Sequence, residues 1–437
     1  MVVSPLLPES IYTVDVSNNQ FGGEIAIQTG KRLTSCEYIN LSGNKFSGPS
    51  LSSLCLTDPG GYARVGLMDL SSNLLSGVIP ASIGQCKNLY SLNLGNNNLT
   101  GNISNELELA SLASLQLNGN NLDGTLDIIG KLHKLEALNL ADNNFGGSIP
   151  TGLGSLHDLK ILSLRSNKLR GSIPQGIVHL QELQILDLPM NNISRPIPRE
   201  MRNLKRLLSR PNDTLLVNIY DNDPLQLQMV IKGIMLQFEQ LHSYSSGIDL
   251  SCNILDGNIP EQIGTLKALG VLNLSHNCIS GSIPTSVGEM VGLESLDISS
   301  NRLSGHIPQS LTGIDWLQFL NVSYNKLNGR IPRGVHFDTL SLGGLAFVGN
   351  DLLCGYPTEK ICEGDRNTST SDANLTNEFD EIDADDDTKE KLLLYAIVAL
   401  GFAVGFWGLF FVLLLKKQNW WFPYWRLVDS FVIRIID

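Results

Sequence analysis

One short stretch of sequence recurs along most of this chain, and it constrains the fold more than any other feature. The copies LNLGNNNLTGNI, LNLADNNFGGSIP and LNLSHNCISGSIP share the frame LxLxxNxLxGxIP, and most copies lie 23 or 24 residues apart. Twelve asparagines occupy the N of this frame: Asn19, Asn44, Asn73, Asn97, Asn120, Asn143, Asn167, Asn191, Asn253, Asn277, Asn301 and Asn325. A repeat of this length indicates a solenoid, in which each unit buries its apolar face only against its neighbours.

Each part of the frame has a physical role. In LxL the two apolar residues point inward and the residue between them points outward, as in a β-strand that must stack on its neighbours. The asparagine follows the strand, where its amide can satisfy backbone groups of the turn and of the next coil. The glycine permits a turn, and Ile-Pro holds an extended segment on the convex side. We therefore predict an α/β-type repeat solenoid with a concave parallel sheet, and we interpret the asparagines as a structural ladder rather than as ligand-binding groups.

The repeat register is interrupted twice. Asn191 and Asn253 are 62 residues apart, which is 38 more than one repeat of 24, and the excess lies between about Arg199 and Ser246. A smaller insertion of about five residues falls near Thr57 to Ala63. Four copies of the frame follow the longer excursion before the repeats end.

A membrane span is predicted near the C-terminus. The run from Leu392 to Leu415 holds 24 residues without a charge, enough for a helix of about 36 Å against a hydrocarbon core of about 30 Å. Lys416 and Lys417 follow it, whereas the segment from Arg366 to Glu390 contributes −7 to the net charge of −12. The positive-inside rule then places residues 1–391 outside the cell. The absence of a basic patch in the sequence disfavours nucleic-acid binding.

The glycosylation sequons agree with this orientation, because all of them precede the predicted span. Asparagine-rich repeats also generate such triplets by chance, so they support the topology without proving it. The nine sequons begin at Asn40, Asn98, Asn102, Asn192, Asn212, Asn273, Asn321, Asn367 and Asn374.

The first residues do not fit a secreted protein. MVVSPLLPES lacks a basic start and an apolar core, so it is not a signal peptide. Taken literally, a single span this close to the C-terminus can insert as a tail anchor and leave the rest in the cytosol. We expect instead that the native N-terminus is missing from this sequence.

No motif indicates enzymatic chemistry or a cofactor. The sequence has no Gly-rich phosphate loop, GxSxG, HExxH or kinase signature, and its cysteines and histidines lack zinc-site spacing. The acidic run from Asp383 to Asp387 lacks the glycine and the final glutamate of a calcium loop. We therefore expect a binding protein, with no metal and no cofactor.

The frame, with its LxGxIP, resembles the extracellular leucine-rich repeats of plants, from about Ile11 to Cys362. This resemblance implies a curved superhelical solenoid with its parallel sheet on the concave face. The excursion resembles the island that plant receptor-like proteins carry about four repeats before the membrane, including Lys232 and Gly233. FVGNDLLCGYPTEKIC resembles their C-terminal cap, which implies a disulfide between Cys354 and Cys362, whereas the corresponding N-terminal cap is absent.

The resemblance and the register together predict the domain layout. The predicted parts are residues 1–198 (about eight repeats), 199–246 (island), 247–332 (four repeats), 333–365 (C-terminal cap), 366–391 (acidic stalk), 392–415 (transmembrane helix) and 416–437 (short cytoplasmic tail). Among the other cysteines, Cys36 and Cys55 can pair around the irregular second repeat, and Cys252 and Cys278 are two positions out of phase and are not expected to pair. Cys86 has no assigned partner.

Function is expected on the concave face, at the variable positions around LxL. The ligand-binding candidates are Tyr90, Gln116, Asp142, Lys160, Arg165, Asp187 and Met190, and the candidates facing a co-receptor kinase are Lys232, Gly233, His276, Phe319 and Tyr324. Any one of these residues can equally be a plain surface residue. A long concave face favours an extended peptide or a protein ligand.

The predicted tail is too short to signal by itself, so a partner must supply the kinase. Gly401 and Gly405 form GxxxG, with Gly408 one turn on, and small residues let helices approach closely. Similarity to kinase-less receptor-like proteins implies an adaptor receptor-like kinase that pairs through the span and the stalk. Tyr424 and Leu427 fit a tyrosine-based sorting signal, although an interfacial aromatic anchor explains the same segment.

These features predict a single-pass, type I plasma-membrane protein without a kinase, similar to plant disease-resistance and ethylene-inducing-xylanase receptor-like proteins. It would bind a peptide or protein and act in defence. The alternatives are a receptor for a developmental peptide signal, a secreted binding module and a truncated decoy that does not signal.

Overall fold

The computed structural model describes residues 11–49, 54–55, 63–104, 111–210, 227–238, 245–335, 337–340 and 342–363. The chain divides into two compact units, Met1–Cys362 and Glu363–Asp437, and nearly all described residues belong to the first. None of the helices in the described ranges has the length and apolar composition that crossing a bilayer requires. The predicted span, stalk and tail, with the sequons at Asn212, Asn367 and Asn374, lie outside the described residues.

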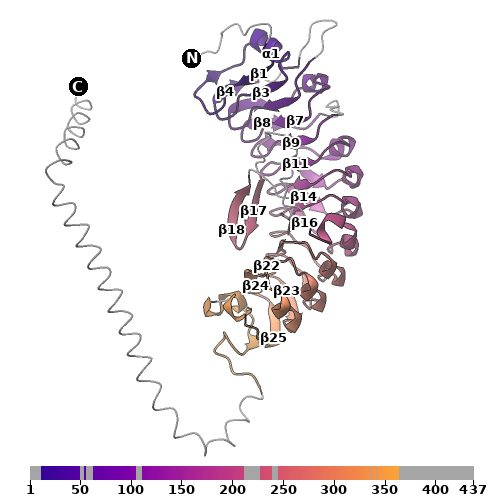
Figure 1. The fold of residues 1–437 in the computed structure, drawn as a ribbon, viewed down its shortest axis with the longest axis vertical. Coiled ribbons are helices and arrows are strands. Elements are labelled where there is room, and N and C mark those ends of the chain that lie inside the picture. Colours follow the sequence, from indigo (N-terminus) through magenta and orange to yellow (C-terminus); the bar gives the residue numbers. More distant parts are fainter. Residues whose placement is uncertain are drawn as a thin grey trace, which may run out of the picture. The chain divides into compact units, whose positions relative to one another are not determined.

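The first unit is built around one parallel sheet, to which every coil contributes three residues (Figure 1). Its register matches the repeat, because Leu92 pairs with Leu115 and Leu115 pairs with Leu138, and all three are fully buried. This finding confirms the predicted solenoid with a parallel sheet. In spatial order, the twelve strands are β1 (Thr13–Asp15), β3 (Tyr38–Asn40), β5 (Leu67–Asp69), β7 (Ser91–Asn93), β9 (Ser114–Gln116), β11 (Ala137–Asn139), β13 (Ile161–Ser163), β15 (Ile185–Asp187), β19 (Gly247–Asp249), β20 (Val271–Asn273), β22 (Ser295–Asp297) and β24 (Phe319–Asn321).

Short second strands follow the turn in most coils and form smaller parallel sheets. The third leucine of the frame, such as Leu99, is the buried residue of these strands. The glycine that ends them adopts a positive φ, as at Gly281 with φ 78°, which L side chains rarely tolerate. These strands are β2 (Gly22–Gly23), β4 (Lys45–Gly48), β6 (Leu74–Gly77), β8 (Asn98–Gly101), β10 (Asn121–Leu122), β12 (Gly146–Ser148), β14 (Lys168–Gly171), β16 (Asn192–Ile193), β21 (Ser280–Gly281), β23 (Arg302–Gly305), β25 (Lys326–Arg330) and β26 (Leu352–Cys354).

The convex side is made of short helices, one α-helix and the rest 3-10 (Figure 1). Proline precedes most of them, as Pro150 and Pro174 do, since its fixed φ suits the start of a helix and it needs no hydrogen-bond acceptor. These helices are α1 (Ile27–Leu33), η2 (Ala81–Gln85), η3 (Asp127–Lys131), η4 (Thr151–Ser155), η5 (Gln175–His179), η6 (Arg199–Asn203), η7 (Lys205–Leu207), η8 (Glu261–Thr265), η9 (Thr285–Glu289), η10 (Gln309–Gly313), η11 (Phe337–Thr339) and η12 (Leu342–Phe347). One continuous hydrophobic core fills the space between sheet and helices.

The asparagine ladder is present, and it points in the opposite direction from the one expected. Asn97 accepts a hydrogen bond from the Leu75 backbone N–H at 3.0 Å and donates to the Leu70 carbonyl at 3.0 Å, both in the preceding coil. It also donates to the carbonyls of Leu94 and Gly95 in its own turn. Each asparagine therefore completes the coil before it, not the coil after it.

We expect Asn301→Ala to lower the free energy of unfolding by about 1–3 kcal/mol, because buried backbone groups lose their partners. Asn301 accepts from the Ile279 N–H and donates to carbonyls that include that of Leu274, and alanine replaces none of these bonds. Urea unfolding measures the effect. The control is His276→Asn, since His276 is exposed with φ 54° and asparagine tolerates that conformation. Equal stability of wild type and Asn301→Ala would contradict the structural role.

The long excursion leaves the sheet intact. Strand β19 pairs directly with β15, with Gly247 opposite Ile185, and Asn253 continues the ladder by accepting from the Ile193 N–H. Within the excursion, η6 and η7 are followed by an antiparallel hairpin of β17 (Leu227–Ile231) and β18 (Ile234–Phe238). Lys232 and Gly233 form its two-residue turn with φ values of 54° and 76°, the positive values that tight hairpins favour.

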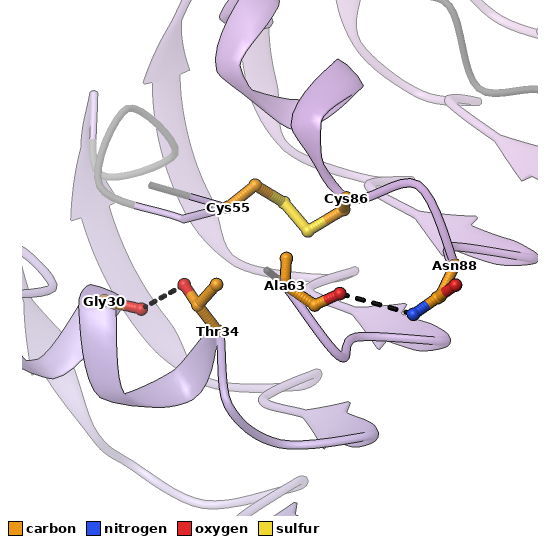
Figure 2. Close-up of a disulfide and its surroundings, with 6 residues drawn as sticks. All are labelled: Gly30, Thr34, Cys55, Ala63, Cys86 and Asn88. Atoms are coloured by element: carbon orange, nitrogen blue, oxygen red, sulfur yellow. Dashed lines mark hydrogen bonds between the residues drawn. A yellow bond between two sulfur atoms is a disulfide. The ribbon is translucent and has the colours of Figure 1, made fainter. Parts of the chain in front are cut away.

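Two disulfides occur among the described residues. One joins Cys354 to Cys362, with Cα atoms 5.1 Å apart. The other joins Cys55 to Cys86 in the following coil, with Cα atoms 5.3 Å apart (Figure 2), so Cys55 does not form the bond with Cys36 that the sequence left open. Cys36 is instead a free thiol in the hydrophobic core.

The local geometry explains the different partner of Cys55. Cys86 is the C-cap residue that directly follows η2. Asn88, two residues on, donates to the Ala63 carbonyl at 3.4 Å. Figure 2 shows this bond beside the disulfide. The disulfide and this hydrogen bond therefore link the residues on either side of the small insertion to the next coil. The repeat frame does not predict this link.

Candidate ligand-binding surface

The hairpin of β17 and β18 lies on the concave sheet (Figure 1). Leu227 and Met229 are almost fully buried against one row of side chains, each the first residue of its strand. This row consists of Ala137, Ile161, Ile185 and Val271. Gly247 holds the same place in β19, and a Cβ there would lie within 2.3 Å of the Met229 Cε. The missing side chain therefore makes room for Met229.

The tip of the hairpin reaches the repeats that follow the excursion. The Lys232 backbone N–H donates to the Ser295 Oγ at 3.2 Å, and Lys232 Nζ donates to the Gln318 Oε1. The Phe319 ring lies 3.4 Å from the position that a Gly233 Cβ would occupy. Lys232, Gly233 and Phe319, which the sequence grouped as co-receptor candidates, are thus brought together, but Lys232 is already engaged within the chain.

A buried ion cluster lies in the central coils. Arg165 Nη2 is 2.8 Å from Asp187 Oδ1 and 3.5 Å from Asp249 Oδ2, and all three side chains are at most 3% exposed. The Ser163 hydroxyl donates to Asp187 Oδ2 at 2.6 Å. Two carboxylates therefore share one guanidinium in a site that water does not reach.

Burial dominates the protonation of this cluster. It raises the pKa of Asp187 to about 6, although the Arg165 guanidinium opposes the rise. Burial also raises the pKa of Asp249, against the lowering effect of hydrogen bonds from Ser251. For Arg165, burial acts to lower the pKa, but the charge of Asp187 keeps it above its ordinary value.

Burial in the sheet changes the interpretation of three candidate residues. Arg165 and Asp187 satisfy each other inside the sheet and have no exposed surface to offer a ligand. Gln116 is likewise 1% exposed. Because neighbouring parallel strands lie only about 4.8 Å apart, polar side chains in one row of the sheet pair with one another. The expectation that these three contact a ligand is therefore corrected.

The raised pKa of Asp187 predicts a specific pH dependence. A carboxyl whose pKa is higher in the folded state adds stability that is fully present below its unfolded pKa and is lost as the pH rises through about 6. We expect wild type to lose about 2 kcal/mol relative to Asp187→Asn between pH 4 and pH 7. Urea unfolding across this range measures the difference. Asp142→Asn is the control, since Asp142 is exposed; parallel stability curves for wild type and Asp187→Asn would refute the shift.

Four other candidates share a feature that the sequence did not reveal. Asp142, Met190, His276 and Tyr324 precede ladder asparagines, and each has a φ between 52° and 56°. They lie in the turn after the strand and are exposed, so their side chains remain available to a partner. The strain of the turn also explains why Asp, Asn, Ser, His and Gly recur there.

Tyr90 and Lys160 lie just before concave strands and are half-buried. Lys160 pairs with Glu136 of the preceding coil. The Tyr90 ring covers Gly66, where a Cβ would lie 2.6 Å from its Cε1. Both side chains are therefore held in place by the coil before them while keeping part of their surface open.

The sequons divide into two classes. At Asn273, the side-chain Oδ1 accepts from the Ser275 N–H and hydroxyl, and the residue is 4% exposed. Asn40 and Asn321 make the same bonds to the serine two residues on. This arrangement argues against a glycan on folded Asn273, because the sequon there forms the turn that ends a strand. Asn98, Asn102 and Asn192 are exposed and remain candidate acceptors.

A small cleft separates the hairpin from the turns that follow β7, β9 and β11. Gln228 and Gln237, which face each other across the hairpin, form one wall. The other wall consists of Asn96, Asn118, Asn139, Ala141 and Asp142. Of these residues only Asp142 was a sequence candidate, because the frame gives no sign of where the excursion folds back.

Comparison with known families identifies the repeat. Residues 133–193 and 247–303 match the family model described as leucine rich repeat, and residues 35–56 and 316–337 match a second model with the same description. The chain therefore carries leucine-rich repeats. Among curated proteins, no sequence match to this chain is found.

Solved structures of similar fold include plant receptor ectodomains and a smaller plant protein. The ectodomain of the plant membrane receptor kinase GASSHO1/SCHENGEN3 from Arabidopsis thaliana, in complex with CASPARIAN STRIP INTEGRITY FACTOR 2, is 27% identical with a TM-score of 0.57, covering 80% of this chain and 42% of that chain. The plant peptide hormone receptor RGFR1 in complex with RGF2 is 27% identical with a TM-score of 0.51, covering 74% and 52%. A plant ice-binding protein is 26% identical with a TM-score of 0.52, covering 68% and 83%. This chain thus spans about half the length of the receptors that it matches.

Proposed function

We propose that this chain is a cell-surface receptor-like protein that binds a peptide or protein on its concave face and signals through partner receptor kinases. The observation that carries the proposal is the hairpin, which docks on the concave sheet with Met229 and contacts the membrane-proximal repeats with Lys232. The hairpin thus contacts the repeats on both sides of the excursion, and a ligand that binds it would lie beside both blocks.

The similarity to plant receptors supports ligand binding by this fold. Two of the similar ectodomains are described in complex with a partner molecule, and one of these as a peptide hormone receptor. On this chain, Asp142 lines the cleft beside the hairpin, and Met190 and Tyr324 are exposed in other turns of the solenoid, where all three would serve a ligand. We propose a role in plant defence, with developmental peptide signalling as the alternative.

The sequence of residues 366–437 supports membrane anchoring and a borrowed kinase. An acidic stalk precedes the uncharged run Leu392–Leu415, and the lysines that follow it favour a cytosolic tail. Gly401 and Gly405 are proposed to form the contact face for an adaptor receptor-like kinase, and the membrane-proximal repeats are proposed to face a co-receptor kinase.

The proposal is tested with the full chain, preceded by a secretion signal and expressed in plant cells. Purification from the plasma membrane should recover a receptor kinase, and Gly401→Leu with Gly405→Leu should reduce this recovery at matched surface expression. Leucine keeps the span apolar, so insertion should survive while close helix packing is lost. Removal of the exposed sequons should also change the mobility of the surface protein. Recovery of no kinase from the wild-type protein would overturn the proposed signalling role.

A non-signalling binding module is the second candidate. The specific observation that favours it is the plant ice-binding protein, of which this chain covers 83%, a larger share than for the receptors. Ice recrystallisation assays of the surface-purified chain distinguish the two roles, since a receptor should leave crystal growth unchanged.

A further inference from the structure

We propose that the cleft beneath the hairpin binds a primary carboxamide, the side chain of an asparagine or glutamine in a peptide ligand. This inference rests on the proposed ligand-binding function and names the chemical group that the site would select. The site is the space between Gln228 and Gln237 of the hairpin and, on the sheet side, the turns that carry Asn96 and Asn118 together with Asn139 at the end of β11.

The size of the cleft suits one short polar side chain. Its volume is about 90 Å³, which equals roughly three water molecules at their share of liquid volume. The cross-strand pair of Gln228 and Gln237 forms the hairpin side. Met229, next to Gln228, anchors this wall in the sheet. One wall is therefore held by an apolar contact that a ligand need not supply.

The lining selects for a neutral group that both donates and accepts. Five of the seven lining residues are asparagine or glutamine, and each of their amides offers two N–H donors and one acceptor oxygen. An apolar ligand group would leave the buried Asn118 Oδ1 without a partner, which costs more than a lost contact. An anionic group would meet the carboxylate of Asp142 at the exposed side of the cleft. A carboxamide matches donors to acceptors and carries no charge.

One residue that lines this cleft, Asn118, carries a buried polar atom without a partner among the described residues. Asn118 is 8% exposed, and its Oδ1 has no hydrogen-bond partner among the described residues. Asn93 Nδ2 and Ser114 Oγ, on the adjoining strands β7 and β9, are likewise buried without a partner in the described part of the chain. Buried polar groups in native proteins are rarely left unpaired, and such groups call for an explanation.

The Asn118 amide has room to respond to a ligand. It packs over Gly95, where a Cβ would lie 2.8 Å from its Oδ1. Because the last torsion of asparagine is broad, the amide can turn and present its oxygen to an N–H donor in the cleft. A carboxamide supplies that donor and an acceptor for the amide nitrogen at the same time.

The test uses the full chain in lipid nanodiscs and small probes observed by saturation-transfer NMR. N-acetyl-asparagine methylamide should bind with a Kd of about 1–10 mM, as expected for so small a ligand. The matched aspartate and leucine probes should bind at least about tenfold more weakly, since the aspartate probe adds a charge and the leucine probe leaves the Asn118 amide unpaired. Cellobiose serves as the carbohydrate probe.

Three variants make the result specific. Asn118→Leu fills the cleft and should abolish binding of the asparagine probe, and Gln237→Leu, on the exposed strand of the hairpin, should weaken it at least about tenfold without touching the solenoid core. Gln175→Leu, on the exposed surface of η5, should change nothing. Hydrogen exchange of residues 227–238 shows whether each variant keeps its hairpin.

The outcomes separate this inference from the proposed function. Equal binding of the asparagine and leucine probes, binding of cellobiose alone, or binding unchanged in Gln237→Leu with an intact hairpin would each overturn the carboxamide site. If the chain still recovers a kinase in any of these cases, the receptor role stands while this inference fails.

Discussion

Replacing Arg165 by alanine is expected to lower the free energy of unfolding by about 3–5 kcal/mol, because it leaves two buried carboxyl groups without their guanidinium. Asp187 and Asp249 are both nearly inaccessible to water, and Arg165 bonds to each of them. Without that charge, the pKa of both carboxyls should rise further, since burial already raises them. The variant should therefore be most destabilised above pH 7, and its deficit relative to wild type should shrink as the pH falls towards about 6.

Urea unfolding at pH 5 and pH 7.5 measures both parts of this expectation. Arg302→Ala is the matched control, since Arg302 is exposed on β23 and surface arginines contribute little. A loss below 1 kcal/mol, or one that does not depend on pH, would show that the Arg165 cluster is not the buried charge network that its geometry indicates.

Met229→Ala is expected to release the hairpin from the concave sheet. Truncating a buried methionine costs about 2–5 kcal/mol, and Leu227 and Met229 are the buried apolar residues that hold the hairpin against the sheet. The open population of the hairpin should therefore rise by a factor of about 30 or more. Faster hydrogen exchange at residues 227–238 and new proteolytic cleavage there would report this opening, while the solenoid remains folded.

Met235→Ala is the matched control in the same hairpin. Met235 lies opposite Val230 on β18 and is 48% exposed, so its truncation removes little buried surface. If the two variants opened the hairpin equally, the docking would not depend on the apolar row that includes Ile161 and Ile185. Loss of ligand binding in Met229→Ala alone would link the docked hairpin to recognition.

Sequence alone was sufficient for the features that each coil repeats. The alternation in LxL, the asparagine after it and the glycine of the next turn have local physical causes, so strands such as β7 and β9 could be predicted with their register. Turn residues such as Asp142 and His276 were recognised as variable positions, but their left-handed conformation was not. That conformation follows from the hydrogen bonds of the neighbouring asparagine, which depend on the stacked coils.

Features that depend on contacts between distant segments could not be predicted. The register shows that residues leave the solenoid after β15, but it does not show that Met229 returns to β19. The pairing of Asp187 with Arg165 needs the two strands side by side, and the same residues appear in the sequence as ordinary variable positions. Cys55 has several possible partners by sequence, and only the path of the small insertion selects Cys86.

The direction of the asparagine ladder has a consequence for how this protein is made. Each asparagine completes the turn of the coil before it, as Asn350 of the cap does by accepting from the Leu327 N–H and donating to the Val322 carbonyl. A chain that leaves the ribosome from its N-terminus therefore holds every newest coil incomplete until the next one emerges. Removing coils from the N-terminal end would leave the asparagine hydrogen bonds of the remaining coils intact. A chain that ended anywhere before the cap would instead leave its last turn without the asparagine that completes it.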